Sequence, residues 1–382
     1  MKDLQGVDVL VVGAGVVGLA SASALARSGR SVLVVERHAG IAREVTSRNS
    51  QVIHAGIYAP PESLKASLCV RGRELLYDWL SERRVACRKL GKLVVAVEEA
   101  EMAGLETLLA QGRASGVPGL EILDARAAKR REPRVAGIGA LYSPETGILD
   151  ASGFALSLLA DAQTHGADLL LRHEVVSMGL HPSGWRVGVR SPGADSVQTV
   201  DCEVVVNAAG LASDGVAEMA GLDLDARCYR QQPCKGSYFA LRRPEDLDLQ
   251  HLVYPAPPAS SGLGGGGLGI HVTRDWLGEV RLGPDAEYVG EHDFRVEATK
   301  AGQFAEAARR YLPGIRADWL VPDFAGIRPK LAGAGEGFRD FVIREESESG
   351  HPGLINCIGV ESPGLTAALA IGERVASQAQ GN

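Results

Sequence analysis

Apolar residues occur along this chain in short runs, which polar and glycine-rich stretches separate. Residues 9–12 and 32–35 are two such runs without a polar position, and a glycine turn followed by a further apolar stretch lies between them. A run of this kind is typical of a strand buried on both faces of a parallel sheet, and two parallel strands need a connecting helix. The pattern therefore predicts a strand–helix–strand unit over about residues 6–37.

The turn inside this unit has the spacing of a dinucleotide-binding motif. Gly13 permits the tight turn, Gly15 lets the backbone approach a pyrophosphate, and Gly18 lets the helix pack closely on the strand. Glu36 comes 18 residues after Gly18, where a carboxylate can hold a ribose hydroxyl. The helix N-terminus adds free N–H groups and a positive dipole for phosphates. We expect this segment to bind a dinucleotide rather than to be a turn without a ligand.

Helical and extended patterns continue through the rest of the chain. They predict helices at residues 62–84, 98–115 and 124–130 and from Asp150 or Ser152 to about His165, and strands at 91–97, 167–171, 174–176 and 203–207. Another helix should begin at Pro363, with Ser362 as its N-cap.

The pattern changes to short β-like runs over residues 236–282, which indicates an antiparallel sheet in a second domain. We therefore expect an α/β (α+β) fold, in which a Rossmann-type nucleotide domain is interleaved with a second domain built on that sheet. The stretch 255–269 contains Ser260, Ser261 and the four glycines 264–267, and is predicted as a loop. Both a lid over an active site and a surface turn fit this composition.

Composition excludes several classes of protein. The chain has 382 residues, enough for two or three domains, and its net charge of −7 argues against nucleic acid as a partner. Its six cysteines form no CxxC pair and no His/Cys spacing that suits zinc, so we expect reduced thiols, no metal and a cytoplasmic protein. The apolar segment 9–26 contains the three motif glycines and is no membrane span, and peripheral contact with a membrane stays open.

Three later segments, 46–58, 326–330 and 359–366, combine glycine turns with polar groups. With them the chain resembles the D-amino-acid-oxidase-type flavoprotein superfamily, and within it is most similar to the L-2-hydroxyglutarate dehydrogenase/oxidase family. The matching stretches cover nearly the whole chain and are residues 46–50, 52–58, 63–66, 68–70, 91–96, 116–120, 269–273 and 282–284.

This resemblance implies FAD as the cofactor, with its flavin ring at the junction of two interleaved domains. The FAD-binding domain would comprise residues 1–85, 140–225 and 322–382, and the substrate-binding domain residues 86–139 and 226–321. Some sarcosine oxidases attach flavin covalently to a cysteine in the stretch that corresponds to 326–330. This chain has no cysteine there, so we expect non-covalent FAD.

Carried onto this chain, the resemblance implies a set of cofactor-binding residues along the length of FAD. The ADP half would contact the glycine turn and Glu36, the ribityl and pyrophosphate the 46–50 segment, and the pyrimidine edge of the flavin residues 364–366. The full set is Gly13, Gly15, Val16, Val17, Gly18, Glu36, Arg37, Thr46, Ser47, Asn49, Ser50, Val175, Ala208, Ala209, Gly210, Gly326, Arg328, Gly364, Leu365 and Thr366.

Oxidation of a secondary alcohol also requires a base for the hydroxyl proton, and histidine is the usual choice. His54 lies in the segment that the resemblance places beside the flavin, in an Ile-His sequence similar to that of glycerol-3-phosphate dehydrogenases. His271, in the second domain, is the other candidate, as base or substrate ligand.

The carboxylate of a 2-hydroxy acid needs a cationic partner, and the planar fork of arginine can bond both of its oxygens. Arg328 stands in a Gly-Ile-Arg-Pro stretch that resembles the carboxylate-binding stretch of glycine oxidases. An arginine paired to a core carboxylate is the structural alternative. Weaker candidates for a second carboxylate are Tyr58, Lys235, Tyr254 and Lys330.

The leading hypothesis is FAD-dependent oxidation of a small 2-hydroxy acid, with L-2-hydroxyglutarate the first candidate. An amino acid or amine oxidase, a glycerol-3-phosphate dehydrogenase-like enzyme and a flavin-binding scaffold or redox sensor are the alternatives. Pro329, Lys330 and the 361–365 loop depart from the better-known 2-hydroxyglutarate enzymes, which puts the substrate in doubt. The electron acceptor, whether oxygen, a quinone or an electron-transfer protein, leaves no mark in the sequence.

Overall fold

The first sheet of the molecule contains the predicted nucleotide-binding unit. The structure is a computed structural model that describes residues 6–193, 196–242, 247–257 and 269–380. Strands β9, β2, β1, β12 and β20 lie side by side in that order and are parallel. β10 and β11 continue antiparallel from β12, and β19 pairs antiparallel with β20. The strand bounds are β1 Val7–Val12, β2 Val32–Glu36, β9 Asp168–Leu171, β10 Glu174–His181, β11 Gly184–Arg190, β12 Gln198–Asn207, β19 Val342–Glu346 and β20 His351–Ile358.

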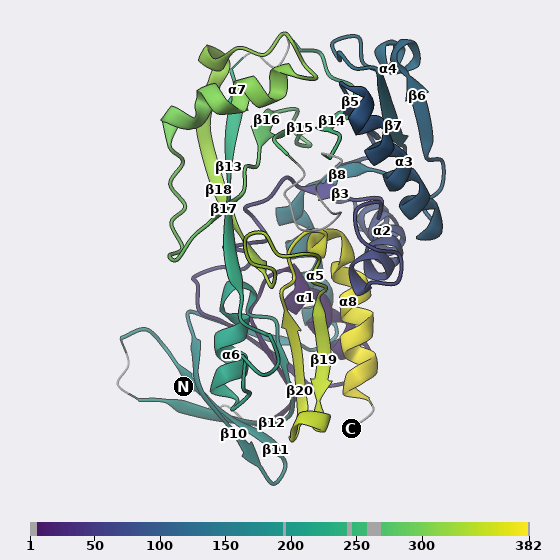
Figure 1. Cartoon of the computed structure of the whole chain (residues 1–382). Coiled ribbons are helices and arrows are strands. Elements are labelled where there is room, and N and C mark those ends of the chain that lie inside the picture. The colour runs from purple at the N-terminus through teal and green to yellow at the C-terminus, as the bar shows by residue number, and fades with distance from the viewer. Residues whose placement is uncertain (1–5, 194–195, 243–246, 258–268, 381–382) are drawn as a thin grey trace.

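Both faces of this sheet are covered, which explains the strands without polar positions. Val9 and Val11 of β1 pack against α1 (Val16–Arg27), α5 (Ala151–Thr164) and α8 (Gly364–Ala379). Leu10 and Val12 point the other way, towards β11 and α6 (Ser213–Met219). Figure 1 shows α1, α5 and α8 together in the lower half of the molecule. The predicted strand–helix–strand unit is therefore confirmed as β1, α1 and β2.

The second sheet lies in the upper half of Figure 1 and is antiparallel, as predicted, except at one pair. Its order is β17-β13-β16-β15-β14-β5-β7-β6, with β18 on β13, and β5 and β14 are parallel. The bounds are β5 Lys92–Ala96, β6 Glu121–Asp124, β7 Gly139–Ser143, β13 Gln232–Leu241, β14 Leu252–Pro255, β15 His271–Arg274, β16 Val280–Gly283, β17 Glu287–Tyr288 and β18 Leu320–Lys330.

Alternate residues of β5 face two different cores. Leu93 and Val95 belong to the core under α4 (Ala125–Arg131) and α7 (Ala301–Arg309). Val94 and Ala96 belong to the core under α3 (Glu99–Ala114), which also contains Tyr254. A side chain at the first position of β5 lies on the same face as Val94, because side chains alternate along a strand.

A small third sheet connects the two halves. Its antiparallel strands are β3 (Val52–Ile53), β8 (Gly147–Leu149) and β4 (Cys87–Arg88), in the order β3-β8-β4. Beside it α2 (Leu64–Glu82) packs on α8. The proposed domain boundaries stay a prediction, and two elements of the second sheet cross them: β7 and most of β18 fall in ranges assigned to the FAD-binding domain.

Two predicted helix N-termini have different outcomes. Asp150 caps α5, since its Oδ1 accepts hydrogen bonds from the N–H groups of Ser152 and Gly153. The prediction that Ser362 caps α8 is wrong. That helix begins at Gly364, one residue later than expected, and no side chain caps it. Ser362 precedes the N-cap residue, Pro363, by one position. Its hydroxyl contacts His54 instead of the helix N–H groups.

The remaining composition-based predictions concern cysteines, metals and membranes. All six cysteines are free thiols, with Cys228 exposed and Cys87 half-buried. Within the described ranges, no cluster of His, Cys, Asp and Glu side chains is arranged to hold a metal ion. None of the helices in the described part of the chain combines the length and apolarity that a membrane crossing requires. The glycine-rich stretch predicted as a lid or turn falls largely at 258–268, outside the described residues.

Candidate active site

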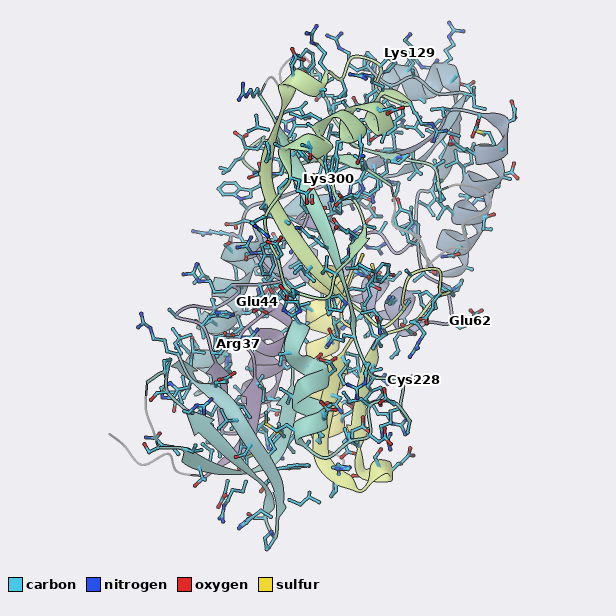
Figure 2. All side chains as sticks on the ribbon, turned by 60° about the vertical axis from the view of Figure 1, so that its left-hand side comes forward. Arg37, Glu44, Glu62, Lys129, Cys228 and Lys300 are labelled. Carbon is cyan, nitrogen blue, oxygen red and sulfur yellow. The ribbon has the colours of Figure 1, made fainter. Side chains whose placement is uncertain are left out.

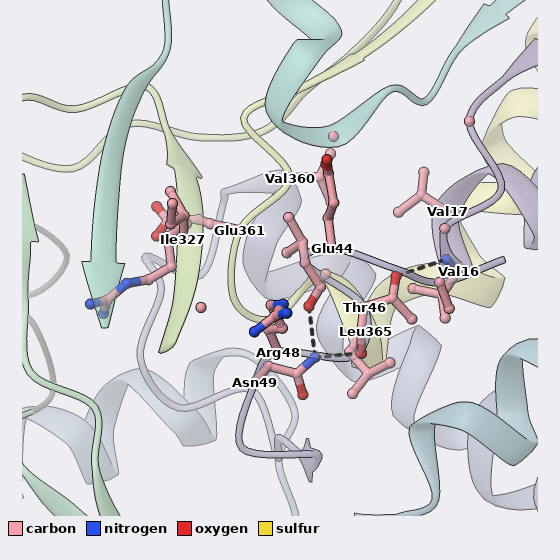
Figure 3. Close-up of a pocket in the computed structure, with 18 of the residues that line it drawn as sticks. Val16, Val17, Glu44, Thr46, Arg48, Asn49, Ile327, Val360, Glu361 and Leu365 are labelled. Carbon is pink, nitrogen blue, oxygen red and sulfur yellow. Dashed lines mark hydrogen bonds between the residues drawn. The ribbon is translucent and has the colours of Figure 1, made fainter. Parts of the chain in front are cut away.

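A cavity of about 450 Å³ lies where the two sheets meet. The turns after β1, β2 and β12 form one end, and residues of β13, β15 and β18 form the other. Figure 3 shows part of its wall, where Thr46, Asn49 and Leu365 surround the space beside the start of α1. Because the carboxyl ends of parallel strands open into it, the cavity occupies the position where α/β folds bind ligands.

The structure brings most of the predicted cofactor-binding residues to this one cavity. Gly18, Ser47 and Thr366 lie outside its lining, and their contact with the cofactor remains a prediction. Those that line it are Gly13, Gly15, Val16, Val17, Glu36, Arg37, Thr46, Asn49, Ser50, Val175, Ala208, Ala209, Gly210, Gly326, Arg328, Gly364 and Leu365.

The glycine turn holds β1, α1 and β12 at a close approach. Gly13 has φ +101°, in the left-handed region, and a Cβ there would lie 2.6 Å from the Ala208 carbonyl oxygen. A Cβ on Gly18 would lie 2.0 Å from the Gly13 carbonyl oxygen. Gly18 thus acts through packing, which explains why it does not line the cavity.

Three polar residues fix the cavity end near β2. The Glu36 carboxylate accepts hydrogen bonds from the Ala14 N–H at 2.9 Å and the His38 N–H at 2.8 Å. Thr46 Oγ1 accepts from the Val16 N–H at 3.1 Å, a contact drawn in Figure 3. Asn49 donates to the carbonyls of Val45 and Thr46. These bonds hold the 44–50 segment against the start of α1.

The two predicted histidines line the opposite end. His54 Nε2 lies 3.3 Å from Ser362 Oγ, and its backbone N–H donates to Thr366 Oγ1 at 3.0 Å. Burial, with Lys92 and His271 nearby, holds the pKa of His54 well below its ordinary value. A neutral imidazole with one nitrogen facing a cavity can accept a proton there.

His271 is buried at 4% exposure and stacks on Tyr254, with ring centres 3.7 Å apart. Its Nδ1 lies 2.9 Å from the Gly269 carbonyl oxygen, so Nδ1 carries the proton and Nε2 is the accepting nitrogen. Burial lowers the pKa of His271 to about 3, assisted by the positive charges of Lys92 and Arg328. Tyr254 and His271 both line the cavity.

Arg328 has no carboxylate partner among the described residues, which removes the structural alternative considered for it. Its guanidinium donates to the carbonyls of Cys234, Lys235 and Asp285. Carbonyls orient the group without neutralising it. Arg328 therefore presents at the cavity wall a positive charge that no direct ion pair within the described residues neutralises.

The weaker candidates lie behind the wall, apart from Tyr254. Lys235 is buried and its ammonium lies 3.6 Å from Asp293. Lys330 is bound to Glu361 at 3.5 Å. The Tyr58 hydroxyl is buried and has no hydrogen-bond partner in the structure. None of these three lines the cavity.

No role at the site was predicted from the sequence for Glu361, Ser362 or Lys92, although Ser362 was expected to cap a helix. Glu361 lines the cavity and pairs with Lys65 at 2.8 Å, while Lys92 is 1% exposed. Burial raises the pKa of Glu361, but the two lysines outweigh it and the net pKa lies below its ordinary value. The signal for Lys92 was a lone charge at the head of the otherwise apolar run 92–96.

Comparison with known proteins identifies the family. Residues 8–378 match the model of the FAD dependent oxidoreductase family. The chain belongs to the FAD dependent oxidoreductases. It is therefore an enzyme with FAD as cofactor, as the sequence predicted.

Individual members of the family are similar over nearly the whole chain. Mitochondrial L-2-hydroxyglutarate dehydrogenase of Arabidopsis thaliana is 38% identical, over 97% of this chain and 83% of that protein. Glycerol 3-phosphate dehydrogenase of Caloramator mitchellensis is 30% identical, over 95% of this chain and 72% of that protein. The structure of FAD-bound L-α-glycerophosphate oxidase of Mycoplasma pneumoniae matches at a TM-score of 0.87 and 26% identity. The match covers 99% of this chain and 95% of that one. The relatives thus include enzymes named for both of these substrates.

The residues present fit the cofactor of an FAD dependent oxidoreductase. The N-termini of α1 and α8 both open into the cavity, and neither N-cap residue, Gly15 or Pro363, forms a side-chain hydrogen bond to its helix. Helix N-termini without a cap leave N–H groups that an anionic ligand can satisfy. The α1 end would hold the pyrophosphate, and the α8 end would hold the part of the flavin that gains negative charge on reduction.

Proposed function

We propose that this protein oxidises a small 2-hydroxy acid to the 2-oxo acid, with L-2-hydroxyglutarate as the leading substrate. The observation that carries the proposal is that the neutral imidazole of His54 and the guanidinium of Arg328, which forms no ion pair within the described residues, line one end of the same cavity. The similarity to proteins named L-2-hydroxyglutarate dehydrogenase supports this substrate.

The chemistry divides between the cofactor and the side chains. Bound FAD supplies the hydride acceptor. His54 accepts the hydroxyl proton of the substrate. Its lowered pKa keeps the imidazole unprotonated at neutral pH, so it is available as an acceptor. Arg328 binds the carboxylate next to the reacting carbon and orients the C–H bond. His271 would hold the substrate hydroxyl or carboxylate from β15.

The charge around Arg328 favours a substrate with two negative charges. Lys65, Lys330 and Arg328 stand near a single carboxylate, that of Glu361, so three cations face one anion. The distal carboxylate of a 2-hydroxydicarboxylate would reduce this excess of positive charge. A 2-hydroxymonocarboxylate would neutralise only one of the two excess positive charges.

The test is anaerobic mixing of the FAD-loaded protein with L-2-hydroxyglutarate, its D-enantiomer, lactate and glycerol 3-phosphate, with flavin absorbance as the readout. We expect rapid bleaching by L-2-hydroxyglutarate, and loss of bleaching rate by about two orders of magnitude in His54→Gln. If no 2-hydroxy acid bleaches the flavin, the proposal is wrong.

Glycerol 3-phosphate is the second candidate, since relatives of that name match the chain closely in sequence and fold. Arg328 would then bind the phosphate, and His54 would accept the C2 hydroxyl proton. Bleaching by glycerol 3-phosphate but by no hydroxy acid would favour this reaction. Bleaching only by amino acids with mild effects of His54→Gln would favour amine oxidation, because a neutral amine needs no base.

A further inference from the structure

Lys92 is a buried cation to which the proposed mechanism gives no role. It is the first residue of β5 and is 1% exposed. Within the described part of the chain no carboxylate forms an ion pair with it. Its ammonium lies over aromatic rings instead, 3.8 Å from the centre of Tyr254 and 5.0 Å from the centre of Tyr58. A charge buried without a counter-charge is costly, and such groups often act at functional sites.

Strand register places Lys92 directly behind the wall of the cavity. Leu252 of β14 lies beside Lys92, and Val253 of β14 lies beside Val272 of β15. Lys92, Tyr254 and His271 therefore share one face of the sheet. Since Lys92 and His271 both lie within 4 Å of the centre of the Tyr254 ring, they occupy its opposite faces.

We propose that Lys92 is a positioning residue, whose ammonium acts through the Tyr254 ring to set how strongly the imidazoles of His271 and His54 hold a proton. Lys92 does not line the cavity, and we expect no contact between it and the substrate. The inference rests on the proposed function in so far as His54 takes the substrate's proton.

The surroundings of Lys92 make it responsive near neutral pH. Burial lowers the pKa of Lys92 to about 7, and the Cys69 thiol of α2 acts in the opposite direction. Burial likewise raises the pKa of Cys69, to about 12, so this thiol stays neutral.

The other groups facing this cluster do not titrate near pH 7. Tyr58 and Tyr254 have raised pKa values because they are buried. The remaining groups are Arg73 of α2, which bonds the Ala55 carbonyl, and Arg328 of β18, and guanidinium groups are not deprotonated in proteins. Lys92 is therefore the group whose charge changes at neutral pH, and both histidines sense it, since its positive charge lowers the pKa of each.

Loss of the Lys92 charge as the pH rises through 7 would make both imidazoles stronger bases. Two charges about 6–8 Å apart at an effective dielectric constant near 20 shift a pKa by about one to two units. The rate of proton acceptance by His54 would rise accordingly, and the site would work best above pH 7.

The test uses the substrate-free holoenzyme with ¹³C-labelled histidine, and His54→Gln and His271→Gln variants assign the two signals. In the wild type we expect both signals to move in one step centred near pH 7. In Lys92→Met the step should vanish, with the signals at their high-pH positions. In Lys92→Arg they should stay at their low-pH positions, because arginine keeps its charge. Lys89→Met, which changes an exposed lysine nearby, should keep the wild-type step.

A step that persists in Lys92→Met, or one that is absent from the wild type, would overturn the inference. If Lys92→Met does not fold, Lys92→Gln makes the same comparison with a polar side chain. In turnover measurements, kcat/KM of the wild type should rise about tenfold as the pH increases through 7. This increase should be missing in Lys92→Met. The ¹³C titrations need no substrate. Failure to oxidise 2-hydroxy acids would therefore refute the proposed function, while the titrations would still decide this inference.

Discussion

Ser362 Oγ lies 3.3 Å from Nε2 of His54, although 308 residues separate them along the chain. The contact joins the loop before α8 to the segment after β3, and Thr366 Oγ1 holds the His54 backbone from the same helix. The α8 end, which we expect to hold the flavin, therefore also orients the candidate base. We therefore expect one element to position both the cofactor and the base.

Removal of the Ser362 hydroxyl should loosen this imidazole. A neutral hydrogen bond contributes about 1 kcal/mol, so Ser362→Ala should lower kcat/KM about fivefold without loss of FAD. Stopped-flow reduction of the flavin measures the effect. Ser377→Ala, at an α8 position remote from the cavity, is the matched control. An unchanged reduction rate in Ser362→Ala would show that the contact does not orient His54.

Arg328 should determine binding of the substrate carboxylate. Loss of charge-assisted bonds worth about 1.5–3 kcal/mol each predicts that Arg328→Met raises KM about 100-fold or more. Arg328→Lys should recover little, because an ammonium lacks the planar fork. The control is Arg316→Met, an exposed arginine paired with Asp318. Equal KM values for wild type and Arg328→Met would contradict the assignment.

Glu361 should stabilise the fold in a pH-dependent way. Glu361→Gln leaves the ammonium groups of Lys65 and Lys330 without their shared carboxylate, which predicts a loss of about 3 kcal/mol at pH 7. Since the pKa of Glu361 is lowered on folding, its contribution is complete above about pH 4.5, the unfolded value, and is lost as the pH falls through the folded value. Tm measured from pH 8 to pH 3 checks this. A Tm difference that stayed constant down to pH 3 would argue against an ionised Glu361.

The glycine turn should be required for the cofactor. A methyl group on Gly18 would lie 2.0 Å from the Gly13 carbonyl oxygen, so Gly18→Ala must push α1 away from β1. We expect purified Gly18→Ala protein to contain less than about a tenth of the wild-type FAD, read from the flavin-to-protein absorbance ratio. Gly302→Ala in α7, where nothing lies within 4 Å of the added methyl, should retain it fully. Full FAD occupancy in Gly18→Ala would show that the turn tolerates the shift.

Local patterns predicted most of the elements because they depend on neighbouring residues. The apolar run 9–12, the glycine spacing and Asp150 each act within a few positions, and the structure has β1, the turn and the α5 cap where they indicate. The Ser362 cap was not found, because α8 begins one residue later than predicted. The Ser362 hydroxyl instead contacts His54, a long-range contact that no local pattern predicts.

The sequence by itself determined the nucleotide-binding unit, the family and the cofactor, since these rest on motifs whose residues lie close together in the chain. The tertiary structure alone decided which polar groups meet. Within the part of the chain that the structure describes, Arg328 forms no ion pair. Glu361 joins two lysines, and Lys92 lies behind Tyr254 and His271. The physical reason is that charge and proton affinity depend on burial and on partners brought from distant strands, and sheet register sets these distances.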